Sequence, residues 1–354
     1  MTAQKRHIVD LSEVKLTDLD LVGGKNASLG EMIQAFKNLG VNIPGGFAIT
    51  VDAYWDFINY NDLREKINSL IKEIKKDDLV SLRKIGLEIR EIIRNGKWPE
   101  ELQNIIIENY QKLSNKYDQD NTDVAVRSSA TAEDLPDASF AGQQETYLNV
   151  RGPEEILSTV RNCFASLFTD RAISYRDNFN FDHFDIGLSV CIQKMVRSDL
   201  ASSGVAFSLD TESGFKDVVL INGSYGLGEM VVQGSVSPDE FIIYKPTFKE
   251  GYKSIIEKKM GRKENKMIYS TDPGKLVKTV HVGNTQQNEF CISDKQALKI
   301  TEWVCLIEDH YSKLKGKWCP MDVEWAIDGL SNELYIVQAR PETIHSRKKD
   351  NDLK

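Results

Sequence analysis

The chain has 354 residues, a length that favours about two or three lobes over a single hydrophobic core. Its 41% hydrophobic and 28% charged residues are typical of a globular protein, and its formal net charge of −8 argues against a general nucleic-acid binder, although a few local basic residues suffice for a nucleotide. Residues 1–20 lack the apolar segment of a secretory leader and no window approaches about eighteen apolar residues, so secretory and membrane proteins are not expected.

Residues 1–120 predict an N-terminal lobe that begins as loop, helix and strand and continues as helices. A glycine-containing loop at 22–26 leads into a helix from Ser28 to Leu39, which Gly40 would end. Its apolar residues recur on one helical face: Leu29, Met32, Ile33, Phe36 and Leu39. Helical periodicity then dominates residues 53–117.

Residues 121–244 predict a second, sheet-rich lobe. Residues 124–126 form a strand, a polar loop follows to Gly142, and 145–150 form the next strand before a helix at 154–168. Further strands are expected at 187–196, 204–209, 218–222 and 240–244.

A C-terminal portion at 245–343 and a solvated linker at 344–354 complete the prediction. Residues 245–288 are rich in lysine and give no clear pattern, whereas 294–314 predict an amphipathic helix. The resulting fold class is α+β, in two to three lobes.

A hairpin near the end of the chain carries the most informative side chains. The segments 320–326 and 334–341 alternate at period two around Asp328-Gly329, which is a strong turn signal. If the pairing centres near Ser331, Glu324 lies opposite Gln338 and Asp322 lies opposite Arg340. Carboxylate and amide oxygens suit Mg²⁺, and a guanidinium suits phosphate, so these four residues predict a metal–triphosphate site.

A surface ion pair between Asp322 and Arg340 is the structural alternative for this hairpin. The flanking residues Trp325, Tyr335 and Ile336 argue for burial instead. Two buried carboxylates facing one guanidinium would be costly without a cation, which favours the metal site.

Lys25 and Arg127 are candidate phosphate ligands. Lys25 follows Gly23-Gly24 and precedes a helix, whose N-terminus attracts anions, but the segment lacks the spacing and the hydroxyl residue of a P-loop. Arg127 ends a strand ahead of small and hydroxyl residues, which also suits phosphate oxygens. A solvated lysine and an arginine paired with Glu133 or Asp134 are the alternatives.

Three further segments have the composition of ligand-binding loops or strand ends. Residues 138–146 contain Gly142 and Thr146 and lead from the Arg127 loop into the next strand. Gln193 ends an apolar strand, whose edge could bind a purine or could be a plain sheet terminus. Residues 223–229 contain three glycines without dinucleotide-binding spacing, which favours a tight turn.

The five cysteines predict neither a disulfide framework nor a structural zinc site. They are scattered, odd in number and never form a C-x-x-C pair. Buried thiols in a reducing cytoplasm are the expectation. The five histidines are equally dispersed and lack the spacing of a metal cluster.

Taken together, these segments resemble the N-terminal nucleotide-binding region of the phosphoenolpyruvate synthase family. The wider group includes pyruvate phosphate dikinases and rifampicin phosphotransferases and shares an ATP-grasp fold. The most specific runs are Arg127 to Asp134, Met195 to Asp199, which favours the synthases, and Gln338 to Thr343. The similarity extends over residues 22–32, 124–150, 164–176, 195–210, 226–241 and 321–343.

The resemblance implies a role for each candidate residue. Lys25 and Arg127 would hold ATP phosphates, Gly142 and Thr146 would belong to a loop over them, and Gln193 would lie at the adenine. In the hairpin, the resemblance implies Mg²⁺ ligation by Glu324 and Gln338 with support from Asp322, and charge stabilisation by Arg340 during phosphoryl transfer. The implied cofactors are ATP and Mg²⁺, and the implied catalytic residues are Arg340, Asp322, Lys25 and Arg127.

The family's reaction converts ATP, pyruvate and water into phosphoenolpyruvate, AMP and phosphate through a phosphohistidine. That chemistry implies a histidine domain and a pyruvate-binding barrel, in cis or in trans, and none of the five histidines here lies in a Gly/Thr/Cys-rich acceptor context. The chain ends eleven residues after Thr343, so it is expected to bind Mg·ATP but not to complete the reaction alone. An antibiotic phosphotransferase lobe and a non-catalytic nucleotide-binding module are the alternatives.

Overall fold

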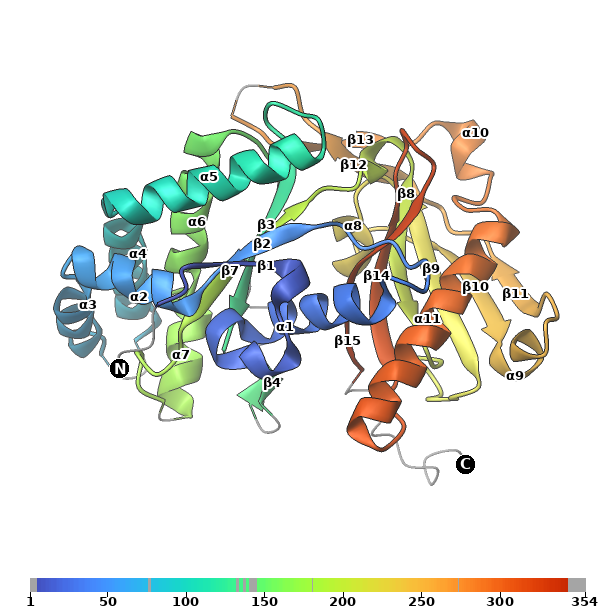
Figure 1. Cartoon of the computed structure of the whole chain (residues 1–354), viewed down its shortest axis with the longest axis horizontal. Helices are drawn as coiled ribbons and strands as arrows, with labels where there is room; N and C mark the ends of the chain where they lie inside the picture. Colours follow the sequence, from blue (N-terminus) through green and yellow to red (C-terminus); the bar gives the residue numbers. More distant parts are fainter. Residues whose placement is uncertain are drawn as a thin grey trace. The chain divides into compact units, whose positions relative to one another are not determined.

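The computed structural model describes residues 5–75, 78–131, 134–135, 138–139, 145–179, 181–272 and 274–342 (Figure 1). The chain divides into two compact units. Unit 1 comprises residues 1–34 and 45–195, and unit 2 comprises residues 35–44 and 196–354. The predicted lobe boundaries at residues 120, 244 and 343 stay a prediction.

Unit 1 is built on a five-stranded antiparallel sheet in the order β1-β2-β7-β3-β6. The strands are β1 (Ile8–Asp10), β2 (Gly46–Ile49), β7 (Leu188–Lys194), β3 (Val124–Ala130) and β6 (Thr146–Val150). The central strand β7 is apolar and almost wholly buried because it has neighbours on both edges and covered faces. The short pair β4 (Asp134–Leu135) and β5 (Ala138–Ser139) forms a separate ribbon.

Helices account for the rest of unit 1. They are α1 (Leu19–Phe36, which ends in unit 2), α2 (Val51–Tyr60), α3 (Leu63–Lys72), α4 (Leu79–Arg94), α5 (Glu100–Lys116), α6 (Pro153–Ser166) and α7 (Asp170–Asn178), with 3₁₀ turns η1 (Leu11–Glu13) and η2 (Leu16–Asp18). Helix α6 packs on strands β3, β6 and β7, and Phe164 on α6 contacts the aromatic rings of α2. The predicted loop at residues 22–26 was wrong in part, because α1 already begins at Leu19 and only Gly23 leaves the helical conformation.

Unit 2 is built on a six-stranded antiparallel sheet in the order β11-β10-β9-β8-β14-β15. The strands are β8 (Ser202–Phe207), β9 (Val218–Tyr225), β10 (Asp239–Tyr244), β11 (Ile255–Lys259), β14 (Met321–Ile327) and β15 (Leu334–Pro341). Figure 1 shows the long helix α11 (Asp294–Lys315, orange) lying across these strands, and its apolar face contacts β8, β9, β10, β14 and β15.

Helix α11 has sequence-encoded ends. Ser293 and Gln296 form a capping box at its start, and Gly316 adopts the left-handed conformation at its end (φ 63°). Residues 245–288, whose sequence shows no clear pattern, contain α9 (Lys245–Lys249), β11, the ribbon β12 (Asn265–Tyr269) with β13 (Val277–His281), and α10 (Asn284–Gln287). Short elements η3 (Ser198–Leu200) and α8 (Glu229–Val232) complete the unit.

The predicted α+β class with antiparallel sheets is confirmed. The strands expected at 187–196, 218–222 and 240–244 and the helices at 154–168 and 294–314 are present within a few residues. Gly226, at φ 86°, provides the turn expected after β9. Within the described ranges, no helix is both long and apolar enough to cross a membrane.

Candidate functional site

The hairpin β14–β15 places its four polar side chains in the predicted register. Asp322 lies opposite Arg340, and Glu324 lies opposite Gln338. Met321, Val323 and Ala339 alternate with them and are buried, so the polar residues occupy the other face of the ribbon. A bulge at Val337 follows the Glu324–Gln338 pair and shifts the register toward the turn.

Arg340 and Asp322 form an ion pair on this face. Arg340 Nε donates a hydrogen bond to Asp322 Oδ2 at 2.8 Å, and the Arg340 Nη2 atom is also 2.8 Å from the same oxygen. The Asp322 side chain is 13% exposed and that of Arg340 is 49% exposed. The contact offered as the structural alternative is therefore present, but with a largely buried carboxylate.

The face nevertheless carries an excess of negative charge. Burial raises the pKa of Asp322; Arg340 opposes that shift, and the neighbouring Glu324 and Glu342 add to it. Glu342, which is 8% exposed, was not among the predicted site residues. Its position could have been found, because it continues the even-numbered alternation of Gln338 and Arg340. Among the described residues, the Asp322 carboxyl therefore interacts with one guanidinium and with two further carboxylates.

The donor set of the hairpin fits Mg²⁺. The ion takes oxygen ligands and commonly binds through one or two carboxylates together with substrate phosphates and water. Glu324 and Gln338 supply a carboxylate and an amide oxygen directly opposite each other. Among the described residues, no group of three or more His, Cys, Asp or Glu side chains is arranged to hold a metal ion. Mg²⁺ binding therefore stays a prediction.

In unit 1, the approach of α1 to β3 depends on Gly23. This residue breaks the helical conformation (φ 74°, ψ 168°), and a Cβ atom built on it would lie 2.4 Å from the Ser129 carbonyl oxygen. Only glycine permits this backbone conformation together with this contact. Asn26 then donates hydrogen bonds to the hydroxyl groups of Ser129 and Ser189 (3.3 and 3.0 Å), which fixes the second part of α1 on the sheet.

Lys25 and Arg127 lie on this same face of the unit 1 sheet. Arg127 shares a strand face with Ser129 and lies opposite Cys191. Burial raises the pKa of the Cys191 thiol to about 12, and the positive charges of Arg127 and Lys25 oppose that shift. Both predicted phosphate ligands are therefore close enough to influence the same thiol electrostatically. Glu133 and the Asp134 side chain, the proposed structural partners of Arg127, lie outside what the structure describes.

Thr146 and Gln193 belong to this face as well. Thr146 lies opposite Arg127, and Gln193 follows Cys191 by two residues on β7. Gln193 is buried, at 2% exposure. The structure thus brings four predicted residues onto one sheet face, whereas Gly142 lies outside the described residues.

A buried ion pair that sequence reasoning missed holds the end of β7 next to Gln193. Lys194 Nζ donates to Asp123 Oδ1 at 2.7 Å and to the Met195 carbonyl at 2.8 Å. The Met195 backbone N–H donates to the Asp123 carbonyl at 3.0 Å. No sequence signal indicates this pair, because its members are 71 residues apart.

Comparison with known proteins identifies a family. The model described as "Pyruvate phosphate dikinase, AMP/ATP-binding domain" matches residues 19–354. The chain is 57% identical to the phosphoenolpyruvate synthase of Aquifex aeolicus over 99% of its own length and 41% of that protein. The chain is 53% identical to the phosphoenolpyruvate synthase of Synechocystis over 98% of its own length and 43% of that protein. It is 48% identical to the phosphoenolpyruvate synthase of Escherichia coli over 95% of its own length and 42% of that protein.

The chain therefore spans less than half the length of these relatives. The family match covers both units and includes every residue predicted for the site. It confirms the resemblance inferred from the motifs, and it agrees with the expected ATP-grasp type of α+β fold. The chain belongs to the pyruvate phosphate dikinase AMP/ATP-binding domain family, and binding of ATP is the property that defines this family.

Proposed function

We propose that this chain is the ATP-binding, phosphoryl-donating part of a phosphoenolpyruvate synthase. The relatives carrying that name match it over nearly its whole length. The proposed overall reaction converts ATP, pyruvate and water into phosphoenolpyruvate, AMP and phosphate through a phosphohistidine. The histidine domain and the pyruvate-binding barrel would lie in the remainder of the enzyme, in cis or in trans.

Each unit contributes a part of the proposed chemistry. In unit 1, the ammonium group of Lys25 and the guanidinium of Arg127 would bind ATP phosphates, with Thr146 as a hydroxyl donor and Gln193 at the adenine end. Gly142 would belong to the loop next to the phosphates. A purine edge needs hydrogen-bonding partners in a dry environment, and Gln193 is suited to this because it is buried.

In unit 2, Glu324 and Gln338 would hold Mg²⁺, and Asp322 would orient Arg340. Mg²⁺ would neutralise charge on the phosphate oxygens when it is bound. Arg340 would stabilise the negative charge that spreads over the transferring phosphoryl group, because about half of its side chain remains exposed although Nε and Nη2 contact Asp322. The observation that carries this proposal is the excess of carboxylate on the hairpin face.

Calorimetric titration with ATP, in the presence and absence of Mg²⁺, tests the proposal. The wild-type chain should bind ATP more tightly with Mg²⁺, and Glu324→Gln should remove that Mg²⁺ dependence. Glu333→Gln is the matched control, because Glu333 is an exposed glutamate of the same hairpin. Absence of ATP binding would overturn the proposal. Binding that ignores Mg²⁺ would favour the non-catalytic nucleotide-binding module.

Compartment is a further part of the proposal. All five cysteines are buried free thiols, which agrees with a reducing cytoplasm. The alternative of an antibiotic phosphotransferase has no observation in its favour, because the relatives compared above carry the synthase name.

A further inference from the structure

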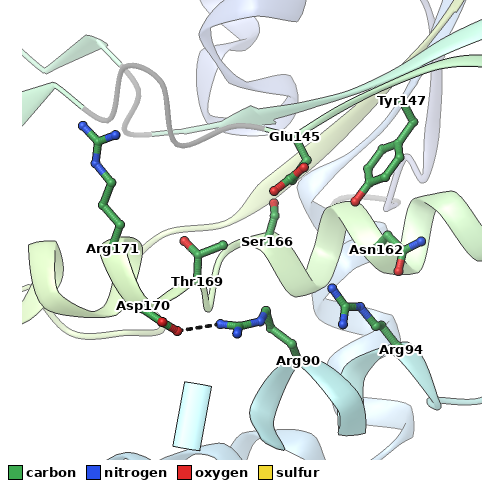
Figure 2. Close-up of a pocket in the computed structure, with 9 residues that line it drawn as sticks. All are labelled: Arg90, Arg94, Glu145, Tyr147, Asn162, Ser166, Thr169, Asp170 and Arg171. Atoms are coloured by element: carbon green, nitrogen blue, oxygen red, sulfur yellow. Dashed lines mark hydrogen bonds and ion pairs between the residues drawn. The ribbon is translucent and has the colours of Figure 1, made fainter. Parts of the chain in front are cut away.

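A polar cavity lies in unit 1, in a position that the proposed nucleotide site does not use. It has a volume of about 360 Å³ and is lined by residues of α4, β6, α6 and α7 (Figure 2). Tyr147 borders it from β6, and Glu145 borders it from the position immediately before this strand. Because side chains alternate along a strand, these two residues point to the opposite face of the sheet from Thr146 and Arg127. The cavity is therefore separated from the proposed phosphate ligands by the sheet itself.

Positive charge dominates this cavity. Three arginines line it, Arg90, Arg94 and Arg171, against two carboxylates, Glu145 and Asp170. Arg90 and Arg94 are four residues apart on α4, so their like charges are neighbours on one helical face. Their proximity is unfavourable, and Asp170 offsets it through an ion pair with Arg90. This local excess is unusual in a chain whose formal net charge is −8.

The arginines differ in how far the protein itself occupies them. Arg90 donates hydrogen bonds to the Phe168 carbonyl at 2.8 Å and to Asp170 Oδ1 at 3.0 Å, the contact drawn as a dashed line in Figure 2. Within the described part of the chain, the side chains of Arg94 and Arg171 make no hydrogen bond or ion pair. Figure 2 shows them on opposite sides of the view, Arg94 beside Asn162 and Arg171 beyond Thr169. Arg90 is fixed in position, and two further guanidinium groups are available for a ligand.

The remaining lining suits hydroxyl groups better than apolar ones. Burial raises the pKa of Tyr147, so its phenol stays protonated and can donate a hydrogen bond at neutral pH. The Ser166 hydroxyl donates to the Cys163 carbonyl at 2.6 Å, which leaves its oxygen as an acceptor. Glu145 supplies a carboxylate that accepts from a hydroxyl, and Asn162 can both donate and accept.

We propose that this cavity binds a small phosphate monoester that carries hydroxyl groups. Arg90 and Arg94 bind the phosphoryl group, because the guanidinium fork matches phosphate oxygens. Glu145 and Ser166 accept hydrogen bonds from the hydroxyl groups of the ligand. The cavity volume lies at the small end of ligand sites, which fits a compact metabolite and not a nucleotide.

The backbone of Glu145 connects the cavity with the opposite face of the sheet. Glu145 immediately precedes Thr146, whose backbone pairs with Arg127 across β6 and β3. The Glu145 carbonyl also accepts a hydrogen bond from the Ser128 backbone N–H at 3.2 Å. A ligand that holds the Glu145 side chain therefore steadies the start of β6, and this part of the inference depends on the proposed function.

Titration calorimetry with inorganic phosphate and with glycerol 3-phosphate tests the site in the 354-residue chain. Both probes should bind in the millimolar range or tighter, with glycerol 3-phosphate the tighter of the two. Arg94→Gln should weaken the binding of both probes by about tenfold, because Arg94 binds the phosphoryl group and its loss removes a charge-assisted contact. Arg83→Gln is the matched control, since Arg83 is an exposed arginine on the same helix and does not line the cavity; its effect should stay below about twofold. Circular dichroism checks that the variants fold.

Four results would overturn the site. The wild type would bind neither probe, or Arg94→Gln would bind both probes as tightly as the wild type does. Phosphate affinity would be lost in Arg127→Ala while Arg94→Gln retained it, which would place the anion in the proposed nucleotide site. Malate would bind at the cavity and neither phosphate compound would, which would identify a dicarboxylate site instead. If the chain does not bind ATP, the proposed function fails, but the affinities for phosphate and glycerol 3-phosphate are unaffected. The two proposals can therefore fail independently.

Discussion

Replacement of Arg340 tests whether this residue acts in phosphoryl transfer or only stabilises the hairpin. The Arg340→Ala variant loses both 2.8 Å contacts to Asp322 Oδ2. A hydrogen bond to a charged group is worth about 1.5–3 kcal/mol, but an exposed ion pair contributes about 1 kcal/mol or less. Because half of the Arg340 side chain is in solvent, we expect the free energy of unfolding to fall by only about 1 kcal/mol.

The expected effect of Arg340→Ala on phosphoryl transfer is much larger. An arginine that stabilises the transferring phosphoryl group contributes a factor of about 10³–10⁵, equivalent to roughly 4–7 kcal/mol of transition-state stabilisation. We therefore expect a loss of at least about a thousandfold in transfer and a change of only a few-fold in ATP affinity. The phosphoryl-transfer rate of Arg340→Lys should lie between those of the wild type and the alanine variant, because lysine keeps the positive charge but lacks the planar guanidinium group that Asp322 orients.

Three measurements on the same protein samples decide between the two roles. Urea unfolding gives the stability change, calorimetry gives the ATP affinity, and transfer is followed to a separately produced histidine domain of a relative. Arg262→Ala, at an exposed arginine of unit 2, is the control for loss of positive charge. Equal losses in ATP binding and in transfer, or a transfer rate that changes no more than stability does, would refute the assignment of Arg340.

Further predictions concern buried charge, backbone conformation and pH. Asp239→Asn should lower the free energy of unfolding by about 3–5 kcal/mol in urea titrations, because it leaves the charge of the fully buried Lys263 uncompensated. Asp309→Asn, which removes an exposed ion pair with Lys249, should lower it by less than about 1 kcal/mol. Equal losses of stability in the two variants would contradict this reasoning. Gly23→Ala should lower the free energy of unfolding by about 3 kcal/mol and should weaken ATP binding. Gly40→Ala should lower it by only about 1 kcal/mol, because Gly40 has a similar φ of 72° but no neighbouring atom within 4 Å of an added Cβ. Burial raises the pKa of Asp322, so the stability contributed by this carboxyl is present at low pH and is lost as the pH rises through its folded-state pKa. Bound Mg²⁺ requires the ionised carboxylates, so the stability that Mg²⁺ adds should instead increase with pH. Thermal unfolding at several pH values, with and without Mg²⁺, measures both trends. Parallel pH profiles in the two conditions would contradict a metal on this face.

Local sequence rules were sufficient for the hairpin. Asp328 accepts hydrogen bonds from the backbone N–H groups of Leu330 and Ser331 at the turn, and this turn sets the pairing of the two strands. Once the register is set, period-two alternation decides which side chains share a face. The pairing of Asp322 with Arg340 could therefore be predicted from residues less than twenty positions apart.

The face of unit 1 required long-range pairing. Its strand order, β1-β2-β7-β3-β6, places β7 between β2 and β3, although β7 follows both in the chain. No local pattern indicates this order, because it depends on the burial of whole strands and helices against one another. The convergence of Lys25 with Arg127, and the placement of Gln193 on the same face, follow from that order.

The sequence by itself determined the family, through its separated motifs, and the polar face of the hairpin, through turn chemistry and strand alternation. Only the tertiary structure decided the kink at Gly23, the buried pair of Asp123 with Lys194, and the arginine-lined cavity. The physical reason is distance along the chain. Turns and strand alternation act between neighbours, whereas burial, ion pairing and close backbone approach join residues that only the complete packing of a unit brings together.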